Sequence, residues 1–164
     1  MDLENFTALA VFFGASFAAA TAGASFKPGE WFESLNHPSW RFPNWVFPVV
    51  WTPLYILIAL SGYFVWREAG WSGAALPLTV YGVHLVINWA WSWVFFGLRR
   101  IDWAMAEVVL LWLSIAATIA VFWPISQTAA LMLLPYLGWV TIASVLNWTM
   151  WQLNPGTGEP RKAG

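Results

Sequence analysis

The sequence predicts an all-α membrane protein, a bundle of five transmembrane helices. Hydrophobic residues make up 60% of the 164 residues and charged residues only 9%, against roughly 25% charged residues in a soluble domain. Such a chain cannot cover its surface with polar groups, so the bilayer is its expected solvent. Its apolar residues form five long segments, each near the length of about 20 residues that crosses the hydrocarbon. The length suggests one membrane domain, residues 1–164.

Composition also excludes several functions. The chain has no cysteine, which excludes disulfides and thiolate metal sites. The formal net charge of −1 gives no support for a nucleic-acid partner. No Walker loop, dinucleotide fingerprint, zinc pattern or Ser-His-Asp arrangement occurs, so soluble-type hydrolase chemistry is not expected. The first residues, Met1–Glu4, are acidic, so the first apolar segment is expected to stay in the membrane rather than act as a removable signal.

The five spans are expected at about residues 6–26, 43–66, 77–98, 101–123 and 129–153. Small residues fill the first span, which permits close packing within the bundle or between two copies of the chain. The second span opens with prolines, and we expect Pro48 and Pro53 to kink it. The third span is expected to begin near Pro77, because proline suits the first turn of a helix.

Most of the fourth span and all of the fifth lie in one stretch, residues 108–158, that carries no charge and is too long for one helix. The sequence "WPISQT" at residues 123–128 supplies proline and polar residues for a turn between them. The sequence "NPGTG" ends the fifth span. The termini of a five-span chain lie on opposite sides of the membrane.

Basic residues divide unequally between the two sides. The side with the N-terminus holds only Arg67. The other side holds Lys27, Arg41, Arg99, Arg100, Arg161 and Lys162. The positive-inside bias then predicts an inner membrane with the C-terminus in the cytoplasm. An outer membrane stays an open alternative, because the bias does not apply after export.

The connection at residues 27–41 is too polar to span the membrane and too aromatic for a plain linker. Trp31, Phe32 and Trp40 give it side chains to bury. Long ordered loops often act as lids, so this segment is expected to cover a cavity between the helices.

The second span places Phe47, Trp51 and Tyr55 four residues apart, on one helix face. This face forms either one wall of a ligand cavity or an aromatic belt with ordinary packing. On the fifth span, small Ala143 shares a face with large Trp139 and with Asn147. That combination either leaves room for a flat ligand or serves tight helix packing.

The third span carries a polar stripe of His84, Asn88 and Ser92, with Trp91 and Phe95 beside it. Polar groups facing lipid are costly, so the stripe is expected to face the interior. Hydrogen bonds between helices would explain it without a ligand. Imidazole suits iron, so His84 is a weak candidate for a haem-iron ligand, although a lone histidine is more often a packing residue.

The fourth span carries Asp102 and Glu107 near its start. Glu107 either contacts a proton or ligand, or is a boundary carboxylate paired with Arg99, Arg100 or a backbone donor. We favour the second interpretation.

Four segments together resemble one known family. They are "KPGEWFESLNHPSW", "NWVFPVVWTPLY", "NWAWSWVFFG" and "PYLGWVTIASVLNWTMW". In this order they resemble the tryptophan-rich sensory proteins, also called translocator proteins or peripheral-type benzodiazepine receptors, in a bacterial form. The resemblance covers nearly the whole chain and agrees with its length, its five spans and its 15 tryptophans.

The resemblance implies a bundle of five helices, often a homodimer, with the first loop folded over a ligand cavity. It implies no obligatory cofactor, with porphyrin or haem as ligand, and sterols, lipids and benzodiazepine-type ligands as further partners. The cavity residues carried over are Trp31, Trp40, Phe47, Trp51, Tyr55, Asn88, Trp91, Trp139, Ala143 and Leu146. Trp51 and Trp139 match tryptophans implicated in porphyrin photochemistry, so they are the candidates for a catalytic role.

Two features depart from the family pattern. The cholesterol-recognition pattern of animal members needs a tyrosine and a basic residue, where this chain has Trp148 and Gln152. His84 stands where relatives often have glutamine. The functional prediction is a membrane receptor or sensor for tetrapyrroles, with a role in tetrapyrrole regulation or stress. The alternatives are a light-dependent porphyrin-degrading enzyme and a transporter of porphyrins or sterols.

Overall fold

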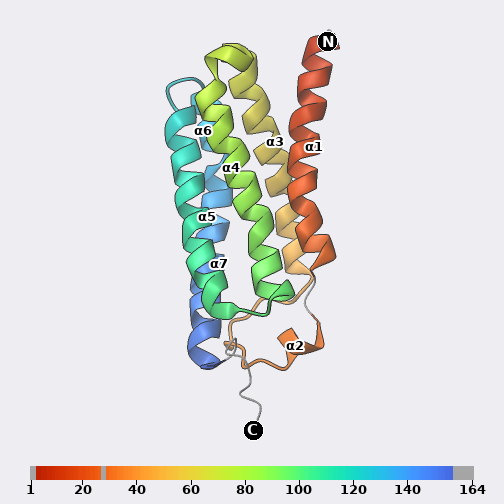
Figure 1. The fold of residues 1–164 in the computed structure, drawn as a ribbon, viewed down its shortest axis with the longest axis vertical. Helices are drawn as coiled ribbons and strands as arrows, with labels where there is room; N and C mark the ends of the chain where they lie inside the picture. The colour runs from red at the N-terminus through yellow and green to blue at the C-terminus, as the bar shows by residue number, and fades with distance from the viewer. Residues whose placement is uncertain (1–2, 27–28, 157–164) are drawn as a thin grey trace.

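The computed structural model describes residues 3–26 and 29–156. Every regular element in these residues is helical (Figure 1). The elements are α1 (Leu3–Ser25), α2 (Glu30–Glu33), α3 (Val46–Gly73), α4 (Ala75–Ser92), the π-helix η1 (Trp93–Gly97), α5 (Ile101–Phe122), α6 (Gln127–Met132) and α7 (Leu134–Leu153). Lys27, Arg161 and Lys162, three of the six basic residues assigned to the side of the C-terminus, lie outside the described residues.

The long helices stand side by side along one axis (Figure 1). α4 packs against α5 and α1, α5 also packs against α7, and α1 also packs against α3. The segment between α1 and α3, with the short α2, crosses one end of the bundle (Figure 1). This end, called the lid end below, also holds the start of α3, η1, the start of α5 and the end of α7.

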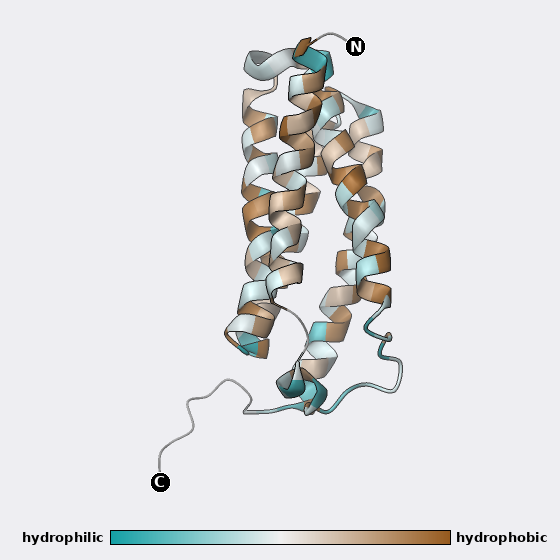
Figure 2. Cartoon of the chain, turned by 90° about the vertical axis from the view of Figure 1, so that its right-hand side faces the viewer, coloured by the Kyte–Doolittle hydropathy of each residue, from teal (hydrophilic) through white to brown (hydrophobic). Residues whose placement is uncertain are grey.

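Within residues 3–26 and 29–156, four helices are long and apolar enough to cross a membrane: Leu3–Ser25, Val46–Gly73, Ile101–Phe122, and α6 with α7 over Gln127–Leu153. Many large apolar side chains of the described residues face outward, among them Val86 at 69% exposure. An aqueous surface would not tolerate so much exposed apolar area, whereas lipid favours it. The chain is therefore a multi-pass membrane protein. Figure 2 shows the contrast between the apolar helices and the hydrophilic segment that joins α1 to α3.

The third predicted span falls on α4 and η1, which are not among the four. α4 has only 18 residues and carries His84 and Asn88, which lower its hydropathy. Both side chains are nonetheless buried, at 1% and 4% exposure. The prediction that this stripe faces the interior is correct for these two residues.

The second predicted span ended too early. The helix continues past Trp66 as far as a kink at Gly70, a further helical turn follows to Gly73, and α4 begins at Ala75, before Pro77. Apolar runs report how long the chain stays in hydrocarbon, and a helix can continue beyond that limit with charged residues such as Arg67. The turn comes at Gly70, whose φ of 67° suits glycine best.

The expected proline kinks are absent from α3. Its only non-helical residue is Gly70. Pro48 lies in the first turn, where a missing backbone donor breaks no helical hydrogen bond. Pro53 lies inside the helix, which keeps helical dihedral angles around it.

The turn expected between the fourth and fifth spans is present after Phe122. Ser126 caps α6, its hydroxyl accepting from the Ala129 amide at 3.4 Å and donating to Glu68 at 2.8 Å. The fifth span is interrupted between Met132 and Leu134, because Pro135 begins a new helix there. The sequence prediction had one continuous helix.

Candidate ligand-binding site

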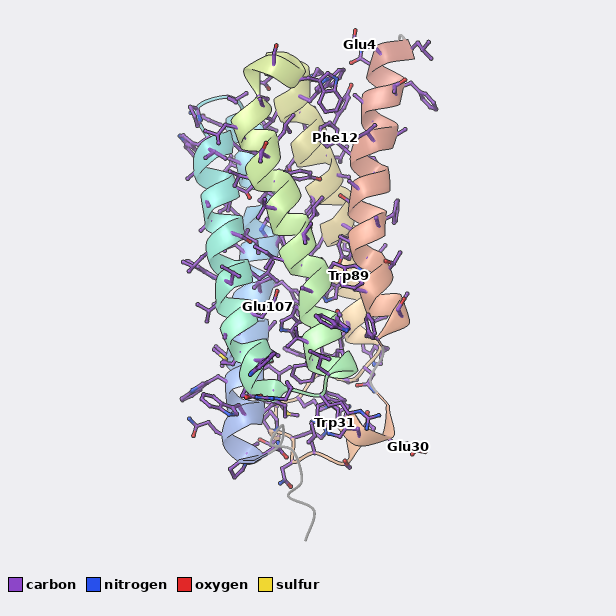
Figure 3. The ribbon with its side chains drawn as sticks, in the orientation of Figure 1. Glu4, Phe12, Glu30, Trp31, Trp89 and Glu107 are labelled. Carbon is purple, nitrogen blue, oxygen red and sulfur yellow. The ribbon has the colours of Figure 1, made fainter. Side chains whose placement is uncertain are left out.

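The lid is the segment of residues 29–45, and it closes the lid end with buried aromatic contacts. Phe32 is 5% exposed and packs edge-to-face on Phe95 and Phe96 of η1, with ring centroids 5.9 and 5.4 Å apart. Trp31 also meets Phe95, at 6.1 Å. Figure 3 shows Trp31 and Glu30 at this end of the bundle. The predicted burial of aromatic lid residues is correct for Phe32, whereas Trp40 stays 43% exposed.

A pair of asparagines fastens the lid to the end of α7. The backbone N–H of Asn36 donates to Asn154 Oδ1 at 2.8 Å, and Asn154 Nδ2 donates to the backbone carbonyl of Asn36 at 2.9 Å. Asn36 Nδ2 also donates to the Leu153 carbonyl. These bonds join residues 118 positions apart, so they define the closed position of the lid.

A second polar contact folds the lid on itself. The Arg41 guanidinium donates two hydrogen bonds to the Glu33 carboxylate, at 3.1 and 2.8 Å. Asn44 bonds to both partners. Hydrogen bonds from Arg41 and Asn44 lower the pKa of Glu33 to about 2. Arg41 also lies 4.9 Å from the centre of the Phe32 ring, so the network braces the buried aromatic side chain.

A small cavity lies beneath the lid. Its volume is about 30 Å³, and its lining comes from the lid, α3, α4, η1 and α7. The lining residues are Phe32, His37, Arg41, Phe47, Trp91, Phe95, Phe96, Ala143, Leu146, Asn147 and Met150. Ligand pockets measure roughly 300–1,000 Å³, so this closed form has room for a water molecule but not for a flat pigment.

Four of the residues predicted for the ligand site line this cavity: Phe47, Trp91, Ala143 and Leu146. Trp31, Trp40, Trp51, Tyr55, His84, Asn88 and Trp139 do not line it. Trp139 lies next to it, since its ring is 6.2 Å from Phe47. The role of each residue in binding stays a prediction.

Aromatic rings fill the space where α3 meets α7. Trp51 stacks on Tyr55 with ring centroids 5.3 Å apart and meets the Tyr136 ring at 5.9 Å. Trp139 lies between Phe42 and Phe47, at 5.9 and 6.2 Å. Of these rings only Phe47 lines the cavity, and the others form a packed aromatic wall beside it.

A hydrogen-bonded chain links three helices above this wall. Tyr55 donates to Asn88 Oδ1 at 2.8 Å, and Asn88 Nδ2 donates to the Tyr136 hydroxyl at 2.7 Å. Asn88 thus bonds α4 to α3 and α7 at once. This matches the interpretation of the polar stripe as contact between helices, and it occupies both ends of the Asn88 amide.

His84 is buried one turn before Asn88. Its Nδ1 lies 2.7 Å from the Tyr81 carbonyl, and its ring packs between Tyr81 and Tyr136. Nε2 is buried and has no hydrogen-bond partner. Among the described residues, no group of three or more His, Cys, Asp and Glu side chains could hold a metal ion.

Glu107 is not paired as expected. Arg100 binds Asp102 through a two-pronged contact, and both carboxyl oxygens of Glu107 are buried without a hydrogen-bond partner. Figure 3 places Glu107 within the bundle on α5. The expected pairing of Glu107 with Arg99, Arg100 or a backbone donor is therefore wrong, since neither carboxyl oxygen has a hydrogen-bond partner.

Several lining residues escaped the prediction. The sequence marked Phe95 only as a neighbour of the polar stripe and Arg41 only as a basic residue of the loop, and it did not single out Phe96, Met150 or His37. Nothing local to these residues marks them, since they meet only when the lid folds back on the bundle. Asn147 offered a usable signal, because it shares the helix face of Ala143 and is the polar residue of that face.

Comparison with known protein families identifies the family of this chain. Residues 6–152 match the model of the TspO/MBR family. The chain belongs to the TspO/MBR family. It is 44% identical over 153 residues to the protein CrtK of Rhodobacter capsulatus, covering 93% of this chain and 96% of that one. It is 41% identical over 150 residues to the tryptophan-rich sensory protein of Cereibacter sphaeroides, covering 92% and 93%.

The similarity extends to animals. The human translocator protein is 38% identical over 139 residues, which cover 82% of each chain. This TspO/MBR protein is therefore alike to bacterial and animal members over most of its length. The resemblance inferred from the four motifs is confirmed.

Proposed function

We propose that this TspO/MBR protein is a membrane receptor that binds tetrapyrroles, porphyrin or haem, in the cavity beneath the lid. The observation that carries the proposal is the cavity lining, which is mostly aromatic and comes from four helical elements and the lid. Aromatic faces suit a planar apolar ligand, each stacked pair adding about 0.5–1.5 kcal/mol beyond burial. The names of its relatives, sensory protein and translocator protein, agree with a ligand-responsive role.

The proposal includes five membrane crossings in one domain, with α4 and η1 as the third. α4 packs along α5 and α1, which are both long enough to span. A helix that turns one face to these neighbours can carry His84 and Asn88 on that face without exposing them to lipid. A homodimer, the cytoplasmic C-terminus and an inner-membrane location belong to the same proposal, as do sterols and lipids as further partners.

Binding requires the cavity to grow. The lid supplies Phe32, His37 and Arg41 to the lining, so its release from Asn154 would open one side. Rotation of the Phe47 and Trp139 rings would join the cavity to the aromatic wall. The ligand would then reach Trp51, which supports the predicted site residues that lie outside the closed cavity.

The charge at the lid is balanced rather than positive. Arg41 lies at the cavity, but Glu33 takes two of its hydrogen bonds. A ligand carboxylate would therefore have to compete with Glu33, and it gains less than a free guanidinium would give. Most of the binding energy in this proposal comes from ring contacts.

Quenching of tryptophan fluorescence by protoporphyrin tests the proposal. Wild-type protein should show saturable quenching, and Ala143→Phe should weaken binding at least tenfold because the new ring fills the cavity. Ile142→Phe is the matched control, since Ile142 is 44% exposed on the neighbouring position of α7. Equal affinity of Ala143→Phe and wild type would refute binding in this cavity.

The double variant Trp51→Ala with Trp139→Ala tests the wall. Loss of two ring contacts should weaken protoporphyrin binding roughly tenfold. The same samples, illuminated with and without oxygen, test the enzymatic alternative with these tryptophans as electron donors. Steady loss of the porphyrin absorbance that stops in the double variant would favour the enzyme over the receptor.

A further inference from the structure

The side chain of Asn147, at the cavity, has a buried polar atom without a hydrogen-bond partner. Its side chain is 2% exposed and lines the cavity from α7. Nδ2 donates to the Ile101 carbonyl at 3.3 Å, whereas Oδ1 is buried with no donor. Exchanging the positions of Oδ1 and Nδ2 by rotating the side-chain amide would break the hydrogen bond to Ile101. Oδ1 is therefore the atom that lacks a partner. A buried acceptor without a donor costs about 1–3 kcal/mol.

Trp91, a second lining residue of the same cavity, has a buried donor in place of a buried acceptor. It belongs to α4 and lines the cavity, and its ring packs on Phe95 at 5.3 Å. Its indole Nε1 is buried without an acceptor. An indole nitrogen can only donate, so it needs an oxygen or an imine nitrogen.

We infer that Asn147 and Trp91 form a polar subsite that recognises a donor and an acceptor side by side on the rim of a planar ligand. A lactam or secondary amide edge has this arrangement, its N–H directed to Asn147 and its carbonyl to Trp91. The inference rests on the ligand cavity proposed above and adds to it the chemistry that selects among flat ligands. Ring stacking alone would not distinguish them, because every planar aromatic offers a face.

The physical basis is the asymmetry between making and losing a buried hydrogen bond. The two unpaired groups already pay their desolvation cost in the closed protein, so a ligand that pairs them recovers it. A ligand that covers them with carbon leaves the cost in place. Sites of this kind discriminate strongly against analogues that lack the polar group.

Three flat tricyclic probes test the inference. Phenanthridinone has both the N–H and the carbonyl, N-methylphenanthridinone has only the carbonyl, and carbazole has only the N–H. Tryptophan quenching in nanodiscs should show phenanthridinone binding wild type about tenfold more tightly than either analogue, because each analogue loses one bond to a buried group.

Two variants assign the bonds. In Asn147→Leu, phenanthridinone and its N-methyl form should bind equally. In Trp91→Phe, which keeps an aromatic ring, phenanthridinone and carbazole should bind equally. Trp66→Phe is the matched control, since Trp66 also has a buried, unpaired Nε1 but does not line the cavity, and it should keep wild-type selectivity.

The outcomes separate this inference from the proposed function. If wild type binds protoporphyrin but the three probes equally well, the subsite is wrong and the receptor proposal stands. If selectivity for phenanthridinone is present and protoporphyrin does not bind, the subsite stands and the tetrapyrrole is wrong. If Trp66→Phe loses selectivity as Trp91→Phe does, or if no probe binds, the subsite is overturned. Should Asn147→Leu not fold, Trp91→Phe alone decides.

Discussion

At the scale of single residues, the interior of this bundle is organised by a few polar side chains among apolar ones. Asn88 uses its whole amide to join α3, α4 and α7 through Tyr55 and Tyr136. In hydrocarbon no water replaces a lost partner, yet measured bonds of this kind between membrane helices are worth only about 1–2 kcal/mol. The network therefore specifies which faces meet more than it stabilises the fold.

Tyr136→Phe tests this network. The change leaves the ring packing and removes the acceptor of Asn88 Nδ2, so we expect the free energy of unfolding to fall by about 1–2 kcal/mol. Unfolding in mixed detergent measures it. Tyr63→Phe is the control. It removes the hydrogen bond from the Tyr63 hydroxyl to Asn5, but Asn5 keeps another interaction, so this variant should lose less stability. An equal loss in both variants would contradict a special role for the network.

Gly62 shows how closely α1, α3 and α4 approach. A β-carbon at this position would lie 2.6 Å from Phe12 Cδ1 and 3.0 Å from Tyr81 Cζ, and both side chains are buried. Gly62→Ala should therefore destabilise the protein by about 1–3 kcal/mol, since the core must shift.

The control for this substitution is Gly82→Ala. Nothing lies within 4 Å of a β-carbon at Gly82 in α4, and alanine favours a helix over glycine by about 1 kcal/mol. Thermal unfolding in detergent should show opposite signs for the two variants. A stable Gly62→Ala protein would mean that the packing of α1 on α3 is looser than described.

Residue-level prediction from sequence worked where a local pattern carries the information. The spacing of His84 and Asn88 predicts their burial, and the spacing of Trp51 and Tyr55 predicts a shared face. It did not work for Glu107, because a carboxylate beside two arginines looks paired until Arg100 is seen bound to Asp102. Nor does any local pattern predict that Arg41 turns back to the cavity.

At the scale of elements, the lid is held in place by polar contacts and by the buried ring of Phe32. The pKa of Glu33 falls from an ordinary 4.5 to about 2 because Arg41 and Asn44 donate to it. A lower pKa in the folded protein means that the ionised carboxylate stabilises the closed lid above about pH 4.5. That contribution is lost as the pH falls towards 2.

Hydrogen exchange of the lid amides, residues 29–41, tests this pH dependence. After correction for intrinsic exchange rates, wild-type protection should fall between about pH 4.5 and 2. Glu33→Gln should show weaker protection already at pH 4.5 and little further change in this window. Glu30→Gln, a change on the same short helix outside the Arg41 network, should behave as wild type. Protection that does not respond to pH in wild type would show that Glu33 does not hold the lid.

Element boundaries followed the hydropathy of the chain only in part. The starts and ends near residues 101 and 122 were predicted closely, because charge and proline mark them. The continuation of α3 to Gly73 was missed, since its last turns are polar and lie beyond the apolar run. The break before Leu134 and the π-helix after Ser92 depend on packing between helices. Such packing cannot be predicted from the sequence of one segment alone.

At the scale of the whole molecule, the fold class and family were available from sequence because apolar length and aromatic motifs are distributed along the entire chain. The cavity was not, because it arises where the lid, η1 and α7 meet. Its size in the closed form, about 30 Å³, makes a specific demand on the proposed function: a tetrapyrrole can enter only when the lid moves.

A reversible lock on the lid tests this account most directly. The chain has no cysteine, so Asn36→Cys with Asn154→Cys can be bridged by a short methanethiosulfonate cross-linker that a reductant removes. Glu68→Cys with Ser126→Cys, which replaces the hydrogen-bonded pair at the opposite end, is the matched control. We predict that the bridged lid abolishes protoporphyrin binding, that reduction restores it, and that the control bridge has no effect. Undiminished binding with the lid bridged would contradict a ligand site beneath it.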